Sequence, residues 1–419
     1  MILVFWLFIG IFHAMKRIYE DLLREHFSNE RQMAFVAGPR QVGKTTLIKS
    51  LCGEGDMSFN WDRSDDRRNI LKGSDFIVEA CGLSDLRSSD SRPLIAFDEI
   101  HKFRQWKNFL KGFFDASEES TSVLVTGSAR LNVYKRGGDS LMGRYFLYRM
   151  HPLSVGELVD RPYDPCVVST PGAISNEEFE SLYRFGGFPE PFTRATDRFY
   201  NRWIGLRTEQ MFREDLRDLT RVQDIDQLMT LSQILLAQAG SLVNYSTLAN
   251  QICVSVDTIR RWMTLLESIY FSFRIRPWFR NVAKSLRKQP KVYPWDWSPV
   301  QNEGARIESF VASHLFKAVH WWNDLGLGQF DLFYIRDTAQ REVDFLISRD
   351  SEPWMMIEVK KSPKEPLSPA LKHFADVLRV PHAYQAVMDM DEVDADCFEA
   401  SRVRKPVRVP LRTLLSQLV

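Results

Sequence analysis

One eight-residue stretch near the amino end of the chain fits the pattern GxxxxGK[ST]: Gly38-Pro39-Arg40-Gln41-Val42-Gly43-Lys44-Thr45. An apolar run, Met33 to Ala37, precedes it, and a helical pattern begins at Thr46. A short apolar run, a glycine turn and a helical pattern predict a strand, a loop and a helix in this order. Further runs of this kind follow, so we expect a parallel sheet covered by helices on both faces.

The chemistry of the loop suits a phosphate group. Its glycines let the backbone curl so that successive N–H groups face one anion, and the helix N-terminus adds partial positive charge. Lys44 would reach the β- and γ-phosphates, and the Thr45 hydroxyl would ligate Mg²⁺. We therefore predict ATP and Mg²⁺ as cofactors, with Gly38 to Thr46 binding the nucleotide.

A second apolar run, Leu94 to Phe97, ends in the two carboxylates Asp98 and Glu99, and Asp98 follows Lys44 by about 54 residues. The carboxyl end of a strand is where an open α/β sheet places its ligands. We expect Asp98 to support the Mg²⁺ ion and Glu99 to polarise the attacking water as the catalytic base.

A third apolar run, Val123 to Val125, leads into hydroxyl side chains and then into arginines. Thr126 or Ser128 is placed to hydrogen-bond the γ-phosphate or the water, and we assign the sensing role to Ser128. The arginines are candidates for stabilising transition-state charge, in the same chain or in a neighbouring subunit. They are Arg130, Arg136 and Arg144, of which Arg144 is the catalytic candidate.

Composition excludes several classes of protein. Of the 419 residues, 44% are hydrophobic and 26% charged, which argues against a disordered or fibrous chain. The 55 Lys and Arg residues nearly balance the 54 Asp and Glu residues, so any basic surface must be local. The five cysteines form no CxxC pair, which indicates reduced thiols and a cytoplasmic protein.

The first twelve residues, Met1 to Phe12, are almost wholly apolar. A membrane-spanning helix needs about 20 such residues. No basic residue precedes the run and no clear cleavage site follows it, which disfavours a signal peptide. We expect Met15 to be the natural initiator, residues 1–14 to be a start-site artefact, and the protein not to bind membrane; a membrane anchor is the weaker alternative.

The sequence from Tyr245 to Trp262 predicts two helices joined by a tight turn. Ser246 and Ser255 are each placed to cap a helix, and Cys253 occupies a position where such turns often carry glycine. With a wing following at residues 270–275, the pattern indicates a winged helix.

A basic segment without acidic residues follows, and in it Trp278 and Phe279 are placed to stack on unpaired bases. Its cations would bind phosphates in a salt-dependent way. We predict DNA contact through residues 245–291; the alternative is a winged helix that packs between domains with its charges solvated. The cations are Arg274, Arg276, Arg280, Lys284, Arg287, Lys288 and Lys291.

Three carboxylates and a lysine occur on the predicted strands and the predicted helix of the C-terminal region. Asp344 lies on one predicted strand, Glu358 and Lys360 share a face of the next strand, and Glu308 lies in a helical pattern. This arrangement resembles the restriction-endonuclease-like nucleases. The resemblance implies that Asp344 and Glu358 hold Mg²⁺ and that Lys360 orients or activates water. The alternative is an exposed pair of strands with ordinary salt bridges.

The order of the motifs resembles a known family. The segments GPRQVGKTT, LIAFDEIHK, VLVTGSAR, LMGRYFLYRMHPLSVGEL and GGFPEPF look like the AAA-type P-loop ATPases of prokaryotes whose C-terminal half is a domain of unknown function. The family's Pro-Leu-Ser and downstream Glu match Pro152 to Ser154 and Glu157, and its Gly-Gly-aromatic-Pro-Glu matches Gly186 to Glu190. The resemblance covers residues 15 to about 360. It implies ATP binding and hydrolysis but names no substrate.

Together these patterns predict an α/β multidomain chain. We expect a parallel-sheet P-loop NTPase core (15–150), a helical lid (151–220), a winged helix (221–299), a small α/β nuclease-like domain (300–400) and a tail (401–419). The leading interpretation is a cytoplasmic Mg²⁺-dependent ATPase that couples nucleotide state to DNA or to a protein partner, with a homo-oligomer as a candidate assembly. The alternatives are an ATP-regulated metal-dependent nuclease and a non-enzymatic nucleotide-gated switch.

Overall fold

The computed structural model describes residues 15–83, 92–117, 121–128, 141–215, 225–279, 288–400 and 405–419. The apolar residues 1–14 and the candidates Arg130 and Arg136 therefore lie outside the described residues. The chain divides into two compact units, Met1–His151 (unit 1) and Pro152–Val419 (unit 2). Among the helices of the described ranges, none has the length and apolar character needed to span a membrane.

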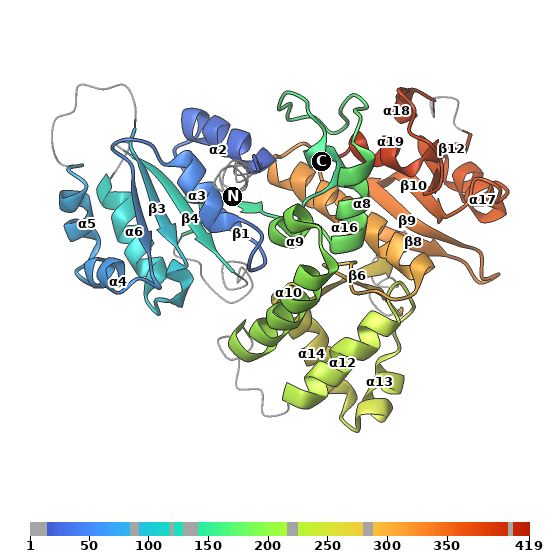
Figure 1. Cartoon of the computed structure of the whole chain (residues 1–419), viewed down its shortest axis with the longest axis horizontal. Helices are drawn as coiled ribbons and strands as arrows, with labels where there is room; N and C mark the ends of the chain where they lie inside the picture. Colours follow the sequence, from blue (N-terminus) through green and yellow to red (C-terminus); the bar gives the residue numbers. More distant parts are fainter. Residues whose placement is uncertain are drawn as a thin grey trace, which may run out of the picture. The chain divides into compact units, whose positions relative to one another are not determined.

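Unit 1 is built around a five-stranded parallel sheet in the order β2-β3-β4-β1-β5 (Figure 1). Strand β1 (Met33–Ala37) lies between β4 (Ser122–Gly127) and β5 (Tyr145–Arg149). Strand β3 (Leu94–Asp98) lies between β4 and β2 (Met57–Asn60). The predicted parallel α/β sheet is confirmed.

Helices cover both faces of this sheet, because β1 and β3 are buried along their whole length. Phe97 of β3 packs against Phe109 and Phe113 of α6 in a cluster that also includes residues of α4 and α5. Helix α3 contacts β4, and α2 packs on α3. The helical elements of unit 1 are α2 (Ile18–Asn29), α3 (Lys44–Leu51), α4 (Ser64–Leu71), α5 (Ser74–Ala80), η1 (Ile100–Lys102) and α6 (Trp106–Ser117).

Unit 2 contains a mixed sheet in the order β12-β11-β10-β9-β8-β6-β7. Its central strands β8 to β10 pair antiparallel, whereas β10, β11 and β12 run parallel to one another. Strand β6 pairs parallel with β8 and antiparallel with β7. The strands are β6 (Ser272–Pro277), β7 (Lys291–Pro294), β8 (Phe330–Arg336), β9 (Glu342–Arg349), β10 (Glu352–Lys360), β11 (His382–Val387) and β12 (Val407–Pro410).

This sheet crosses the expected boundary at residue 300. The segment expected as a wing becomes β6, whose Arg276 and Pro277 pair with Phe333 and Tyr334 of β8. Backbone pairing therefore joins the strands after α14 to the strands that follow α16. The helical elements of unit 2 are α7 (Val155–Leu158), α8 (Asn176–Phe185), α9 (Pro189–Arg194), α10 (Asp197–Gln210), η4 (Met211–Asp215), α12 (Ile225–Ala237), α13 (Tyr245–Ile252), α14 (Val256–Ser268), α16 (Glu303–Asp324), α17 (Pro369–Leu378), α18 (Cys397–Ala400) and α19 (Leu411–Ser416).

The C-terminal residues, expected as a tail, are part of this fold where the structure describes them. Strand β12 pairs with β11, and Leu411, Leu414 and Leu415 of α19 are buried. The expectation failed because a four-residue strand carries little signal in the sequence, whereas its place at the sheet edge satisfies its backbone.

Pro152 to Glu157 and Gly186 to Glu190, the segments of unit 2 that resemble the ATPase family, contact each other, and the first of them also contacts helix α16. The Lys317 ammonium of α16 contacts the Glu157 carboxylate at 2.5 Å and the Ser154 hydroxyl at 2.7 Å, and both charged side chains are only 1% exposed. The N–H of Leu153 donates to the carbonyl of Gly187 at 2.6 Å. These residues therefore hold the first helices of unit 2 against its longest helix.

A buried histidine lies beside this ion pair and makes unit 2 sensitive to acid. His314 accepts a hydrogen bond from the N–H of Val155 at 3.0 Å, and its other ring nitrogen lies 2.7 Å from the carbonyl of Phe310. Burial, and then the charge of Lys317, lower the pKa of His314 to about 3. The unfolded chain thus takes up a proton below about pH 6.5 that the native chain excludes until about pH 3.

We expect the free energy of unfolding of unit 2 to fall by about 1.4 kcal/mol per pH unit below pH 6.5 because of His314. Denaturant unfolding between pH 7.5 and 5 measures this slope. In the variant His314→Gln, whose amide still accepts from Val155, this part of the slope should vanish. Equal slopes in the variant and the wild type would contradict the assignment.

Candidate functional site

The glycine-rich loop connects β1 to α3 at the carboxyl edge of the sheet in unit 1. Gly43 caps α3 with a φ of 107°, a left-handed conformation that glycine adopts without strain. At Gly38 a Cβ atom would lie 2.4 Å from the carbonyl oxygen of Met150, so the loop packs too closely on its neighbour for any side chain there. The predicted strand, loop and helix are therefore present, with glycine where the backbone requires it.

Lys44 is buried in this loop and is 6% exposed. Its ammonium donates to the carbonyls of Gly38 at 2.9 Å and Pro39 at 2.7 Å. Both acceptors belong to the loop itself, so the charge lies among the backbone groups that would surround a phosphate. Exchanging two carbonyls for phosphate oxygens requires only rotation of a flexible side chain.

Asp98 is the centre of a hydrogen-bond cluster at the end of β3. One carboxylate oxygen accepts from the Thr45 hydroxyl at 2.7 Å and from the Asn60 amide at 2.9 Å, and the other accepts from the Thr126 hydroxyl. Asp98 is 3% exposed, so these partners replace water around its charge. The loop and the second motif therefore meet, as predicted. The sequence did not identify Asn60, whose only signal is its position at the end of the short strand β2.

The donor set fits a magnesium ion, because Mg²⁺ is held in proteins by one or two carboxylates together with phosphate and water oxygens. The Thr45 hydroxyl and the Asp98 carboxylate are such oxygens, and the two residues adjoin although they lie 53 positions apart in the chain.

Glu99 has a left-handed backbone, with a φ of 56°, and its N–H donates to the carbonyl of Thr126 at 3.0 Å. Its carboxylate lies 3.2 Å from the ammonium of Lys102 and 3.8 Å from Nε2 of His101. Although burial alone lowers it, the pKa of Lys102 is raised by its hydrogen bond to Asp62 and by the Glu99 charge. Sequence reasoning missed Lys102 and His101 as partners of Glu99.

The two candidate hydroxyls, Thr126 within β4 and Ser128 directly after it, have different partners in the structure. The Thr126 hydroxyl is bound to Asp98, whereas the Ser128 hydroxyl lies 3.1 Å from Nε2 of His101. The Ser128 hydroxyl and the Glu99 carboxylate therefore lie beside the same nitrogen, Nε2 of His101.

Arg144 lies at the wrong edge of the sheet to act on the loop of its own chain. It directly precedes β5, and the N–H of Met33, where β1 begins, donates to the Arg144 carbonyl at 2.9 Å. The loop follows Ala37 at the other end of β1, about 16 Å away for a five-residue strand. Its guanidinium instead contacts Asp115 at 2.8 Å. The within-chain role is corrected, and action on a neighbouring subunit stays a prediction.

In unit 2 the carboxylates expected for a nuclease surround a lysine. The Lys291 ammonium lies 3.0 Å from Glu308, 2.8 Å from Glu342 and 3.8 Å from Asp344. Lys291 is only 4% exposed, so it does not belong to the phosphate-binding surface expected of it. Sequence reasoning missed Glu342, which comes two residues before Asp344 on the same face of β9.

Glu358 and Lys360 form a second part of this cluster and contact each other at 2.9 Å. Burial raises the pKa of Asp344, and the charges of Glu308 and Glu358 raise it further. Burial likewise raises the pKa of Glu358. The four predicted residues are thus gathered in one region. Within the described ranges, however, no set of three or more His, Cys, Asp or Glu side chains is arranged to hold a metal ion.

The predicted helix pair is formed by α13 and α14, with Cys253 at the turn in a left-handed conformation (φ 60°). Ser255 caps α14 by accepting from the N–H of Thr258 at 3.1 Å, as expected. The cap of α13 is Asn244 rather than Ser246, because helix α13 begins two residues earlier than a cap at Ser246 would place it, and the Asn244 side chain accepts from its first turn. Arg274, expected on the DNA surface, is bound to Glu267.

Comparison with families of known proteins shows which kinds of domain this chain resembles. Residues 30–159 match the family described as "AAA domain". Residues 176–302 and 303–401 match two families described as domains of unknown function, DUF8612 and DUF4143. Unit 1 thus contains an AAA-type P-loop domain, and the chain is a nucleotide-binding, ATPase-like protein.

Similar proteins occur in bacteria and archaea. The uncharacterized protein Rv2008c of Mycobacterium tuberculosis is 23% identical over 341 residues, covering 77% of this chain and 71% of that protein. The uncharacterized protein MJ1637 of Methanocaldococcus jannaschii is 20% identical over 310 residues, covering 66% of this chain and 64% of that protein.

Two solved structures have weaker similarity. The structure of C. elegans PCH-2 has a TM-score of 0.24 and 14% identity, covering 61% of this chain and 72% of that chain. A DNA polymerase III gamma subunit-related protein of Thermotoga maritima has a TM-score of 0.25 and 11% identity, covering 60% of this chain and 97% of that chain. Neither similarity supports an inference about activity.

Proposed function

We propose that the protein hydrolyses ATP with Mg²⁺ in unit 1 and couples its nucleotide state to DNA or to a protein partner through unit 2. The observation that carries the ATPase proposal is the Asp98 cluster. It brings the loop hydroxyl of Thr45 to 2.7 Å from a buried carboxylate at the end of a neighbouring strand. This pairing of a loop hydroxyl with a strand carboxylate is the arrangement that P-loop ATPases use for Mg²⁺.

Residues of the loop and of the Asp98 cluster would have different roles in phosphoryl transfer. Thr45 and Asp98 would hold the metal, which neutralises charge on the β- and γ-phosphates when bound. The loop N–H groups and Lys44 bind and orient the phosphates. Asn60 and Thr126 hold Asp98 in place by their hydrogen bonds to its carboxylate.

Glu99 is the proposed general base. Its carboxylate is held by Lys102 and lies near His101, which also contacts the Ser128 hydroxyl. Ser128, the proposed sensor of the γ-phosphate, thus shares Nε2 of His101 as a neighbour with Glu99. We propose that His101 and Lys102 position the base, and that Glu99 accepts the proton of the attacking water.

We expect Glu99→Gln to bind ATP like the wild type and to lose about 100-fold or more in turnover, because glutamine cannot accept the proton of the water. The measurement is phosphate release at saturating ATP in Mg²⁺, beside binding of a fluorescent ATP analogue. Glu54→Gln, an exposed carboxylate of the same unit, is the matched control and should behave like the wild type. Unchanged turnover by Glu99→Gln would remove Glu99 from this role.

The described carboxylate cluster of unit 2 does not favour the nuclease alternative. An ammonium group, that of Lys291, lies among the carboxylates where a nuclease needs a divalent ion. We therefore do not propose nuclease activity for Asp344, Glu358 and Lys360. Assembly into a homo-oligomer and a cytoplasmic location stay predictions.

A further inference from the structure

Two hollows adjoin on the surface of unit 2, well separated along the chain from the nucleotide loop. The aromatic hollow, of about 990 Å³, is lined by Trp278, Phe279, Tyr334, Phe374 and Leu378. The basic hollow, of about 650 Å³, is lined by Tyr245, Arg260, Arg274 and Arg276. Lys288 and Gln289 line both hollows, so the two form one continuous surface.

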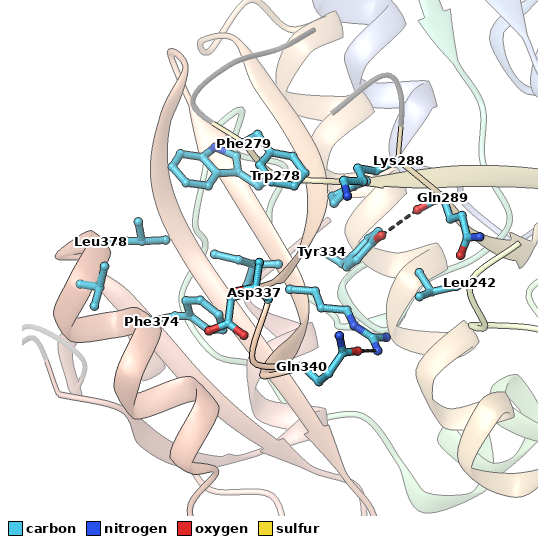
Figure 2. Close-up of a pocket in the computed structure, with 15 residues that line it drawn as sticks. Leu242, Trp278, Phe279, Lys288, Gln289, Tyr334, Asp337, Gln340, Phe374 and Leu378 are labelled. Atoms are coloured by element: carbon cyan, nitrogen blue, oxygen red, sulfur yellow. Dashed lines mark hydrogen bonds between the residues drawn. The ribbon is translucent and has the colours of Figure 1, made fainter. Parts of the chain in front are cut away.

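The aromatic hollow has a rigid base. The backbone N–H of Trp278 donates to the Tyr334 carbonyl at 2.7 Å, which fixes the backbone of Trp278 just after β6. The Tyr334 hydroxyl donates to the Gln289 carbonyl at 2.7 Å. In Figure 2, Trp278 and Phe279 lie on one side of the hollow and Phe374 lies on the other. Trp278 and Phe279 are half-buried, so their rings keep surface that a ligand can contact.

The positive charge of the basic hollow is neutralised in part. Arg260 is paired with Asp257 and Arg274 with Glu267, and the remaining cations of its described lining are Arg276 and Lys288. Within the part of the chain that the structure describes, no carboxylate forms an ion pair with Arg276 or Lys288. Lys288 is exposed at the point where the two hollows join. Asp337, a carboxylate that also lines the aromatic hollow, is paired with Arg341 at 2.7 Å.

We propose that these two hollows bind single-stranded DNA, with bases stacking on Trp278 and Phe279 and phosphates contacting Lys288 and Arg276. Rings beside free cations fit a ligand that has both π-faces and a chain of anions. In duplex DNA the faces of the bases are hidden in the stack, and an acidic peptide has no bases to offer the rings. Polar side chains, among them Thr338 and Gln340, also line the aromatic hollow, so the comparison of oligothymidylate with oligouridylate tests the choice of DNA over RNA.

This proposal rests on the part of the proposed function that gives unit 2 a partner, and it names that partner. It does not depend on ATP hydrolysis, because the residues that line the two hollows belong to unit 2 alone. Binding is therefore measured with the full chain in the absence of ATP, so a failure of the ATPase proposal leaves the result intact.

The test is fluorescence anisotropy with a labelled oligothymidylate of about 20 nucleotides. This is longer than the stretch of single-stranded DNA that one binding fold usually covers. Duplex DNA and oligouridylate of equal length and a polyglutamate peptide are the competing ligands. We expect Trp278→Ala and Phe279→Ala each to weaken oligothymidylate binding about tenfold, by loss of stacking. Lys288→Ala should reduce the salt dependence by roughly the share of one phosphate. Lys364→Ala, an exposed lysine outside both hollows, is the matched control and should bind like the wild type.

Several outcomes would overturn the proposal. They are absence of oligothymidylate binding by the wild type at low salt, tighter binding of duplex, oligouridylate or polyglutamate, and unchanged binding by both aromatic variants. Thermal unfolding of each variant shows that it is folded, and Phe279→Ala tests stacking independently if Trp278→Ala does not fold.

Discussion

Replacing Lys44 with alanine should abolish detectable ATP binding and reduce turnover by at least about 100-fold, the loss typical for one preorganised charge at a reacting centre. The ammonium is buried in the loop and already surrounded by the backbone groups that would face a phosphate. Lys49, the other lysine of α3, is exposed in the last turn of that helix and does not replace this charge. The measurements are equilibrium binding of a fluorescent ATP analogue and phosphate release.

Lys49→Ala is the matched control, because it removes the same charge from the same helix. ATP in large excess over its dissociation constant should raise the melting temperature of the wild type and of Lys49→Ala by several degrees, and it should leave Lys44→Ala unchanged. A folded Lys44→Ala protein that binds ATP like the wild type would show that the loop is not the nucleotide site.

The second large effect concerns stability. Lys317→Ala should destabilise unit 2 by about 3 to 5 kcal/mol, because it leaves the Glu157 carboxylate buried without its counter-charge. The pair is almost inaccessible to water, and the ammonium also contacts the Ser154 hydroxyl and the Pro152 carbonyl. Denaturant unfolding followed by circular dichroism measures the change in the transition of unit 2.

Two further variants make this prediction specific. Lys361→Ala breaks an exposed ion pair with Glu303 and should cost less than about 1 kcal/mol. The double variant Lys317→Met/Glu157→Gln leaves no buried charge and should be more stable than Lys317→Ala. If Lys317→Ala were no more destabilising than Lys361→Ala, the junction between the first helices of unit 2 and α16 would not depend on this pair.

The geometry of the proposed nucleotide site could be predicted from the sequence because each of its parts is local. The loop lies between a strand and a helix that it connects, and Asp98 ends a strand whose apolar run is unmistakable. Parallel strands bring their carboxyl ends to one edge of the sheet, so the sequence alone predicts that Thr45 and Asp98 lie close together. The sequence does not predict Asn60 and Lys102 as part of the site, because a four-residue strand and a single helical turn carry no chemical pattern of their own.

In unit 2, local patterns were less informative because long-range pairing decides which residues meet. Lys291 belongs to a basic run in the sequence, yet the pairing of β7 with β6 and the packing of α16 bring it among Glu308, Glu342 and Asp344. Arg144 shows the same principle in unit 1, since the direction of β5 places it at the edge away from the loop.

By itself the sequence determined the phosphate loop, the parallel sheet that carries it and the carboxylates of the second motif. These follow from the backbone freedom of glycine, from periodicity and from the direction of parallel strands. Only the tertiary structure decided which charges in unit 2 neutralise one another and which remain available to a ligand. That choice depends on distances between side chains far apart in the chain. Lys291 and Lys288 lie three positions apart in one basic segment, yet one is enclosed by carboxylates and the other faces solvent.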